Sequence, residues 1–206
     1  MDFEKEIIEY ENTNYDRPYI VKIGLIPVII TAPHGIKQTK SDGKIKLSEP
    51  FTKAITQYIA NQTNASFLIK TKDTKVDANS EEKENFKDTL LYLIKKHNIK
   101  LLIDIHGAKK ERDFDIEFGT LNNLSIDYTV IKELEDAFKE EGIKNIVYNN
   151  PFKGGGITRY IYANTNIDII QIEINQKYRD YNNIENIQKV CNALNKFINQ
   201  YISYLK

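Results

Sequence analysis

Two of the three histidines in this chain of 206 residues, His34 and His106, are each followed directly by a glycine. The first His-Gly pair comes shortly after an apolar run at residues 27–31, and the second follows a largely apolar run at residues 101–105. Glycine lets the backbone turn and leaves room beside the imidazole ring. Two imidazoles at the ends of neighbouring strands can converge on one metal ion, and a catalytic zinc commonly takes two histidines and one carboxylate. The two histidines therefore indicate a metal centre, with a hydrogen-bonded core histidine as the alternative for each alone.

Asp104 stands two residues before His106, and side chains two apart share one face of a strand. Two titratable residues on one face of a buried strand are costly unless they are hydrogen-bonded or used. A carboxylate beside a ligating imidazole accepts the proton of its other ring nitrogen and fixes the tautomer. We therefore expect Asp104 to orient a metal-binding His106.

Glu173 lies in a further predicted strand, where it shares a face with Gln171 and Asn175. An acid in an apolar strand is seldom there for solubility, and desolvation raises its pKa toward neutral. Such a carboxylate can act as a general base that takes a proton from a metal-activated water and returns it to the leaving amine. The alternative is an edge-strand carboxylate paired with Arg159 or Arg179.

Three consecutive glycines, residues 154–156, precede a predicted helix start that carries Arg159. The glycines expose backbone amides in a flexible loop, and the guanidinium group of arginine matches the geometry of a carboxylate. The spacing and the Lys-Ser/Thr ending of a phosphate-binding loop are absent. The segment predicts a carboxylate-binding loop, with a plain connecting loop as the alternative.

The elements that must position these residues alternate between strands and helices. Segments with strand patterns lie at residues 19–23, 27–31, 66–70, 101–107, 114–120, 146–148 and 167–174, the first two joined by a tight turn around Gly24. Segments with helical spacing lie at 50–61 (capped by Ser48), 81–97 (capped by Ser80), 126–141 and 184–205, while residues 36–47 form a loop. This order predicts one domain, residues 1–206, built as a three-layer α/β/α sandwich with a mixed, mainly parallel central sheet. Ligand crevices in such sheets lie at the carboxyl ends of the strands.

Composition limits the partners. Lys plus Arg and Asp plus Glu both number 29, a balance that does not favour general nucleic-acid or anionic-membrane binding. Cys191 is the single cysteine, which excludes an intramolecular disulfide and a thiolate zinc cluster. No apolar run has the length of a membrane span, and the N-terminus lacks the order of a signal peptide. We expect a soluble cytoplasmic protein with no nucleic-acid or membrane partner.

Five segments, in this order, resemble the motifs of the N-formylglutamate amidohydrolase (N-formylglutamate deformylase) family. They are Ala-Pro-His-Gly at 32–35, Val-Asp-Ala-Asn-Ser at 76–80, Ile-Asp-Ile-His-Gly at 103–107, Pro-Phe-Lys-Gly-Gly-Gly-Ile-Thr-Arg at 151–159 and Gln-Ile-Glu-Ile-Asn at 171–175. The resemblance implies a fold of the zinc carboxypeptidase or phosphorylase/hydrolase type, related to aspartoacylase. It also implies a hydrolase that acts on the C–N bond of a linear, non-peptide amide.

The resemblance implies roles for individual residues. His34 and His106 look like ligands of Zn2+ or another divalent metal, and Glu173 looks like the base and acid. Carboxypeptidase-like sites place an acidic ligand three residues after the first histidine, where this chain has Lys37. Glu49 resembles the acidic position of the family before its first long helix and is our choice of third ligand, with Asp77 and Asp42 as reserves.

The remaining roles concern ligand support and the substrate. Asp77, like Asp104, is expected to support a ligand, while Asn79, Arg159 and Arg179 are expected to bind substrate. Ser80 replaces a family arginine that helps to hold the substrate carboxylate, and Arg179 lies close enough in sequence to compensate. We therefore expect an amidohydrolase that cleaves the N-acyl or N-formyl amide of a small acidic amino acid. The alternatives are a peptidase or amidase for peptide or cell-wall substrates, or a non-catalytic binding protein.

Overall fold

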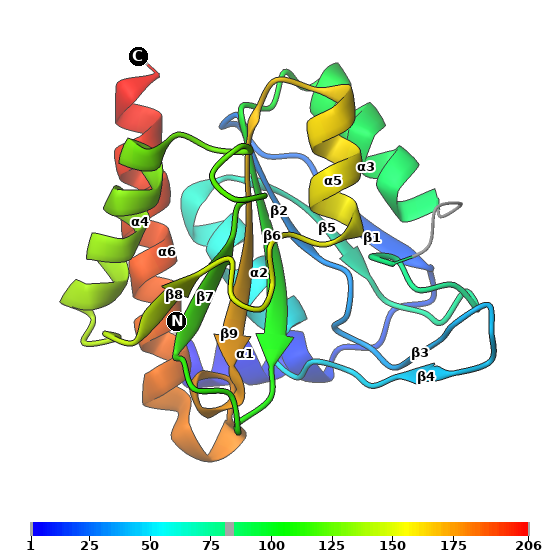
Figure 1. Cartoon of the computed structure of the whole chain (residues 1–206). Coiled ribbons are helices and arrows are strands. Elements are labelled where there is room, and N and C mark those ends of the chain that lie inside the picture. The colour runs from blue at the N-terminus through cyan, green and yellow to red at the C-terminus, as the bar shows by residue number, and fades with distance from the viewer. Residues whose placement is uncertain (1, 81–84, 206) are drawn as a thin grey trace.

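The computed structural model describes residues 2–80 and 85–205 (Figure 1). Its helices are α1 (Phe3–Asn12), α2 (Thr52–Thr63), α3 (Asn85–Lys96), α4 (Tyr128–Glu140), α5 (Gly156–Asn164) and α6 (Ile184–Tyr204). Its strands are β1 (Tyr19–Lys22), β2 (Val28–Ala32), β3 (Gln38–Thr39), β4 (Ile45–Lys46), β5 (Ser66–Lys70), β6 (Leu101–Ala108), β7 (Ile116–Gly119), β8 (Ile146–Tyr148) and β9 (Asp168–Asn175). Two short 3-10 turns at residues 176–178 and 181–183 link β9 to α6.

The central sheet has seven strands in the order β1-β5-β2-β6-β9-β7-β8. Strands β5, β2, β6 and β9 run parallel, so their carboxyl ends meet at one edge of the sheet. β1 is antiparallel to β5, β7 is antiparallel to β9, and β8 is parallel to β7. The predicted mixed, mainly parallel sheet is confirmed.

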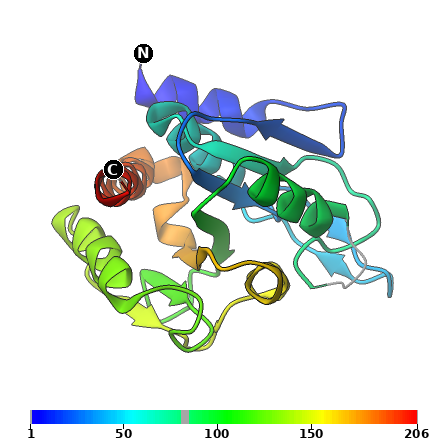
Figure 2. The ribbon, with the colours of Figure 1, turned by 90° about the horizontal axis from the view of Figure 1, so that it is seen from above.

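The helices form two layers, one on each face of this sheet (Figure 2). α1, α2, α4 and α6 pack on one face and share the larger hydrophobic cluster with the strands. α3 and α5 cover the other face with a smaller cluster. The predicted three-layer α/β/α arrangement is therefore confirmed, while a single domain over residues 1–206 stays a prediction.

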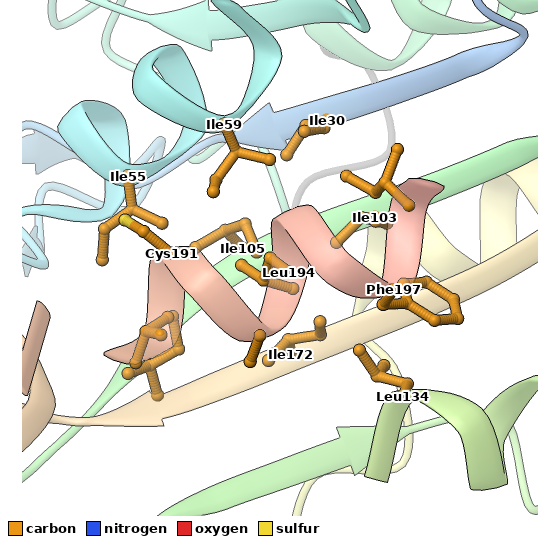
Figure 3. Close-up of a cluster of buried hydrophobic side chains, with 14 of the residues drawn as sticks. Ile30, Ile55, Ile59, Ile103, Ile105, Leu134, Ile172, Cys191, Leu194 and Phe197 are labelled. Carbon is orange, nitrogen blue, oxygen red and sulfur yellow. The ribbon is translucent and has the colours of Figure 1, made fainter. Parts of the chain in front are cut away.

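The long C-terminal helix α6 lies against the sheet with its apolar stripe inward. Cys191 lies beside Ile55 of α2, Leu194 lies near Ile105 and Ile172 of the central strands, and Phe197 lies near Leu134 of α4 (Figure 3). Burial raises the pKa of the Cys191 thiol, which suits an unreactive packing residue. The apolar face of the sheet thus forms the main core.

On the opposite face of the sheet, the side chains change from apolar to polar toward the carboxyl ends of the parallel strands. In β6, Ile103 and Ile105 point into the larger cluster, so the alternating residues Asp104 and His106 point to the α3/α5 face. The smaller cluster includes Leu102 but not these two polar residues, because α3 and α5 pack nearer the amino ends of the parallel strands. The same alternation brings further polar residues to this face: Thr31 of β2, Glu117 of β7, and Gln171 and Glu173 of β9. Polar side chains therefore gather at the carboxyl end of this face.

Two connections differ from the prediction. β1 does not form a hairpin with β2 across the turn at Gly24, because β5 lies between them in the sheet. The Gly24 amide donates to Ser66 Oγ, and a Cβ at Gly24 would lie 2.0 Å from the Asn64 carbonyl oxygen. Residues 36–47 are not a plain loop, since β3 and β4 pair within them as a short hairpin.

The beginnings of two helices also differ from the prediction. α1 was not predicted, although Asp2 caps it and Ile7 is buried, because its polar composition leaves a narrow apolar stripe. α2 begins at Thr52 without a Ser48 cap, since Phe51 before it has φ 64°. The predicted start of the third helix, residues 81–84, lies outside the described residues. Over the described ranges, no helix has the length and apolarity needed to cross a membrane.

Candidate metal centre

His34, Glu49 and His106 come together from three separate segments. His34 follows β2 by two residues, His106 lies near the end of β6, and Glu49 lies between β4 and α2. β2 and β6 are neighbouring parallel strands, so the two histidines emerge at the same edge. The Glu49 amide donates to the His34 carbonyl oxygen at 2.9 Å, which holds the loop against the end of β2.

The two imidazoles face one carboxylate. Glu49 Oε1 lies 3.1 Å from His34 Nδ1, and Glu49 Oε2 lies 3.6 Å from His106 Nδ1. One ligand atom from each of these three residues lies within 4.8 Å of the others. The side chains are buried, with exposed fractions of 3% for His34, 6% for Glu49 and 2% for His106. Two histidines and one carboxylate at this spacing match one of the donor sets found in catalytic zinc sites.

The other nitrogen of each imidazole is bonded to a buried aspartate. His34 Nε2 lies 2.8 Å from Asp77 Oδ1, and His106 Nε2 lies 3.0 Å from Asp104 Oδ2. The Thr31 hydroxyl donates to Asp104 Oδ1 at 2.6 Å from the neighbouring strand, a contact that was not predicted. These bonds fix both rings with Nδ1 directed to Glu49. Such carboxylate–histidine pairs orient metal ligands and increase their basicity.

This geometry distinguishes Glu49 from the two other candidates for the acidic ligand, Asp77 and Asp42. Asp77 lies on the Nε2 side of His34, away from Glu49, and therefore supports His34 instead of completing the group. Asp42 lies between β3 and β4 and pairs with Lys44 on the surface. Among the described residues, Glu49 is the acid that joins the two histidines.

The buried charges of the centre shift the pKa values of Glu49 and His106. Burial disfavours the charged form of Glu49, but the positive charge of His34 and hydrogen bonds with both imidazoles hold its pKa well below the usual value. Burial likewise opposes the charging of His106, yet Asp104 and Glu49 raise its pKa well above the usual value. Lys46 Nζ also lies 2.6 Å from Glu49 Oε1. Carboxylates thus attract positive charge here, and a divalent cation fits this donor set.

Gly107 and Arg179 hold Glu49 and the backbone around the centre in place. The Gly107 amide donates to Glu49 Oε2 at 2.8 Å, and a Cβ at Gly107 would lie 2.4 Å from Arg179 Cζ. The buried Arg179 guanidinium donates to the carbonyl oxygens of Ile174, Pro50 and Ala108. Arg179 thus ties together the backbone behind the centre and does not line the pocket around it, so a role in substrate binding stays a prediction.

Glu173 stands beside His106. The two residues are register partners on the parallel strands β6 and β9. Gln171 Nε2 donates to Glu173 Oε1 at 2.7 Å, and neither Arg159 nor Arg179 pairs with this carboxylate. Burial raises the pKa of Glu173, and the charge of Glu49 raises it further, against the lowering effect of His106. The carboxylate is thus held beside the centre without an arginine partner.

The glycine loop closes the pocket from the side of β8. The Gly155 amide donates to Gln171 Oε1, and Asn79 Oδ1 accepts the Ile157 amide at 2.9 Å. Asn79 therefore caps α5 from another segment, because Gly155 at the cap position has no side chain. A Cβ at Gly156 would lie 1.7 Å from the Asn79 carbonyl oxygen, so only glycine allows this approach.

These groups surround a pocket of about 510 Å³. Its lining is His34, Lys46, Glu49, Asn79, His106, Gly107, Ala108, Lys109, Arg112, Pro151, Phe152, Lys153, Gly154, Gly155, Arg159, Gln171 and Glu173. The predicted residues His34, Glu49, His106, Glu173, Asn79 and Arg159 all line it, whereas Arg179 does not. The pocket therefore brings the candidate ligands, base and carboxylate-binding loop together.

The lining carries five basic side chains but two acidic ones, Glu49 and Glu173. Four of the basic residues were missed by the sequence analysis: Lys46, Lys109, Arg112 and Lys153. Lysine is frequent throughout this chain, so nothing in the local sequence separates these from solvated surface lysines. Their position around one cavity creates a positive potential that favours anionic ligands.

The chain resembles known proteins both in sequence and in fold. The model of the N-formylglutamate amidohydrolase family matches residues 84–178, a range that includes His106, Arg159 and Glu173 but not His34 or Glu49. The match confirms the predicted resemblance and supports the predicted enzyme class, a hydrolase of a non-peptide amide. No curated protein matches the sequence of the chain.

Solved structures show the same fold at low sequence identity. An N-formylglutamate amidohydrolase from Ralstonia eutropha JMP134 aligns with a TM-score of 0.68 and 12% identity, over 92% of this chain and 99% of that one. A bacteriophage poly-gamma-glutamate hydrolase aligns with a TM-score of 0.61 and 14% identity, over 99% of this chain and 100% of that one. A metallo-carboxypeptidase from Burkholderia cenocepacia aligns with a TM-score of 0.54 and 13% identity, over 91% of this chain and 61% of that one.

Proposed function

We propose that this chain is a metal-dependent amidohydrolase that cleaves the N-acyl or N-formyl amide of a small acidic amino acid. One observation carries the proposal: the buried group of His34, Glu49 and His106 lies beside Glu173 in a pocket lined by basic residues. The match to the N-formylglutamate amidohydrolase family over residues 84–178 supports the same reaction class.

Zinc is the metal that this donor set favours, since imidazole and carboxylate ligands in a two-to-one ratio are typical of zinc hydrolases. Nδ1 of each histidine and the Glu49 carboxylate are the atoms that would hold it. When bound, such an ion polarises an amide carbonyl group and lowers the pKa of a water molecule. Asp77 and Asp104 would keep both imidazoles in the required tautomer.

Glu173 would move the proton. Its raised pKa suits a carboxylate that accepts a proton from water near neutral pH and then donates it to the departing nitrogen. Gln171 holds Glu173 Oε1 by its amide group, which leaves the second carboxylate oxygen for proton transfer. Because Glu173 is the register partner of His106, this oxygen would lie close to a carbonyl group held at the metal.

Basic side chains would bind and orient the substrate. Arg159, whose guanidinium is held by the Gly154 carbonyl oxygen at 2.9 Å, is the best placed partner for a substrate carboxylate. Lys153 and Lys109 add positive charge to the lining of the cavity, and Asn79, which caps α5, also lines it. A substrate with two carboxylates, such as an N-acyl glutamate or aspartate, would match this distribution.

A longer acidic amide is the second candidate substrate. Five basic residues exceed the charge of one N-acylated acidic amino acid, and the aligned bacteriophage protein is a poly-gamma-glutamate hydrolase. Ser80 also stands in place of the family arginine that helps to bind one small carboxylate. These three observations favour a γ-linked or peptide-like acidic chain over other peptidase substrates.

Amine release from a substrate panel would test the proposal. Protein purified with zinc would be offered N-formyl and N-acetyl amino acids, γ-linked glutamate oligomers and cell-wall peptides, with Glu173→Gln as the inactive control. We expect hydrolysis of acidic substrates and one tightly bound metal ion per chain, lost in His106→Ala. A chain that binds metal but releases no amine from any of them would instead be a binding protein with this fold.

A further inference from the structure

Glu117 on β7 is a buried glutamate to which the proposed reaction gives no role. Its side chain has an exposed fraction of 0%. It is the register partner of Glu173 across the antiparallel pair of β7 and β9, and side chains directly opposite each other in such a pair have Cβ atoms about 5 Å apart. Two glutamates therefore lie next to each other at the base of the pocket.

The two oxygens of Glu117 have different surroundings. Oε1 accepts the Phe152 amide at 2.5 Å, and the backbone of Asn150 adds a further hydrogen bond to this carboxyl group. Oε2 is buried and has no hydrogen-bond partner among the described residues. The charged groups that face Glu117 are Glu173 from β9 and Arg112 from the connection between β6 and β7.

These contacts tie Glu117 to a loop that lines the pocket, residues 149–155. The Arg112 guanidinium also lies over the Phe152 ring, at 5.1 Å from its centroid, so Phe152 has a second contact besides its bond to Glu117. At the other end of the loop, the Gly155 amide bonds to Gln171, which in turn bonds to Glu173. The loop is thus bonded to Glu117 of β7 at Phe152 and to Gln171 of β9 at Gly155.

The surroundings of Glu117 favour its protonated form. Burial raises the pKa of Glu117 to about 7, hydrogen bonds from Phe152 and Asn150 oppose this, and the charge of Glu173 adds to it. An ionised carboxylate with one unpartnered buried oxygen would cost far more free energy than a neutral carboxyl group. A neutral side chain still accepts the Phe152 amide through Oε1.

We propose that Glu117 is a positioning residue which, by accepting the Phe152 amide, anchors the loop of residues 149–155 and so places its substrate-binding groups opposite Glu173. The inference rests on the proposed amidohydrolase function for its effect on substrate binding. It assigns the loop a fixed position before the substrate arrives, which lowers the entropic cost of binding. The expected kinetic effect of losing the anchor is therefore on KM more than on kcat.

Two variants distinguish the hydrogen bond that Glu117 accepts from the loop from the charge of its carboxyl group. Glu117→Gln keeps a neutral side chain of the same shape with an oxygen acceptor, whereas Glu117→Ala removes the acceptor. We expect Glu117→Gln to stay within about twofold of the native kcat and KM near pH 6.5. Glu117→Ala should raise KM about tenfold, because one buried hydrogen bond contributes roughly that factor, with kcat within about threefold.

A readout that does not need activity accompanies the kinetics. Amide hydrogen exchange of residues 149–155 should become faster in Glu117→Ala and stay native in Glu117→Gln, with the metal content of both variants unchanged. Glu135→Ala serves as the control, because Glu135 is also mostly buried but lies on α4, where it pairs with Lys132 and Lys139. This control should leave both KM and loop exchange as in the native chain.

Three other results would contradict either the role of Glu117 or the proposed function. Equal losses in the Gln and Ala variants would overturn the proposal, since they would show that the ionised charge matters and not the acceptor. Native loop exchange in Glu117→Ala would also overturn it. Absent hydrolysis in the native chain would contradict the proposed function alone, because loop exchange would still report on the anchor.

Discussion

His106 and Glu173 occupy the same register position on two neighbouring parallel strands, β6 and β9. A candidate metal ligand and a candidate base therefore lie side by side, each buried and each held by a polar side chain two residues earlier on its own strand. For His106 this is Asp104, and for Glu173 it is Gln171. The ladder between the two strands sets the distance between ligand and base, so the geometry does not depend on a flexible loop.

Replacing Glu173 by Gln should reduce kcat by about 10²- to 10⁴-fold, the usual effect of removing a general base. Metal content should stay native, because Glu173 is not part of the group of His34, Glu49 and His106. Amine release and metal analysis on the same preparation measure both quantities. A variant that keeps native kcat would exclude Glu173 as the base.

Replacing Asp104 by Asn should weaken metal binding by about 10- to 100-fold, the usual effect of losing the carboxylate behind a ligating histidine. The reason is that Asn carries no charge to support the imidazole at its Nε2 side. Asp42→Asn is the matched control, since Asp42 pairs with Lys44 at the surface away from the centre. Competition with a chelator gives both affinities, and equal values for the two variants would contradict the assignment.

Replacing Gly107 by Ala should destabilise the fold by about 1–3 kcal/mol, a typical cost of overpacking. The added Cβ would lie 2.4 Å from Arg179 Cζ and would also disturb the Gly107 amide that holds Glu49. Urea unfolding measures the stability, and metal titration should show a parallel loss of affinity. Native stability of Gly107→Ala would mean that Arg179 moves freely.

The stability of the chain should depend on pH through Glu117. Burial raises the pKa of Glu117 in the folded chain to about 7 from the ordinary 4.5. Between these two values the folded chain keeps a proton that the unfolded chain has released, so stability falls as pH rises through this window. Gln does not titrate, and Glu117→Gln should therefore gain up to about 3 kcal/mol relative to the native chain between pH 4 and pH 8. Denaturant unfolding at both pH values gives this difference, and a pH-independent difference would contradict a buried titrating Glu117.

Patterns within single segments were sufficient for much of the fold and part of the site. Alternation of apolar residues located the central strands, and it placed Asp104 with His106 and Gln171 with Glu173 on common faces. This information is local, because a side chain two residues away on a strand always lies on the same face. Motif order then indicated the reaction class that the family match supports.

The same reasoning did not predict helix α1, which has a narrow apolar stripe, or the short β3–β4 hairpin. Both elements have contacts with distant segments, α1 through Phe3 and Tyr58 and the hairpin through Thr39 and Asp73, and their local patterns resemble those of loops. The β1–β5 pairing was missed for a related reason, since a strand's partner depends on where the chain crosses and not on the strand's own residues.

The sequence by itself determined the strand faces, the two histidines at one sheet edge and the late glutamate. Only the tertiary structure decided that Glu49 and not Asp77 faces both Nδ1 atoms, and that Arg179 binds backbone carbonyl groups instead of lining the pocket. The same holds for the basic lining and for Glu117 beneath it. The physical reason is that strand periodicity acts over two residues, whereas these contacts join segments tens of residues apart whose approach depends on how the whole chain packs.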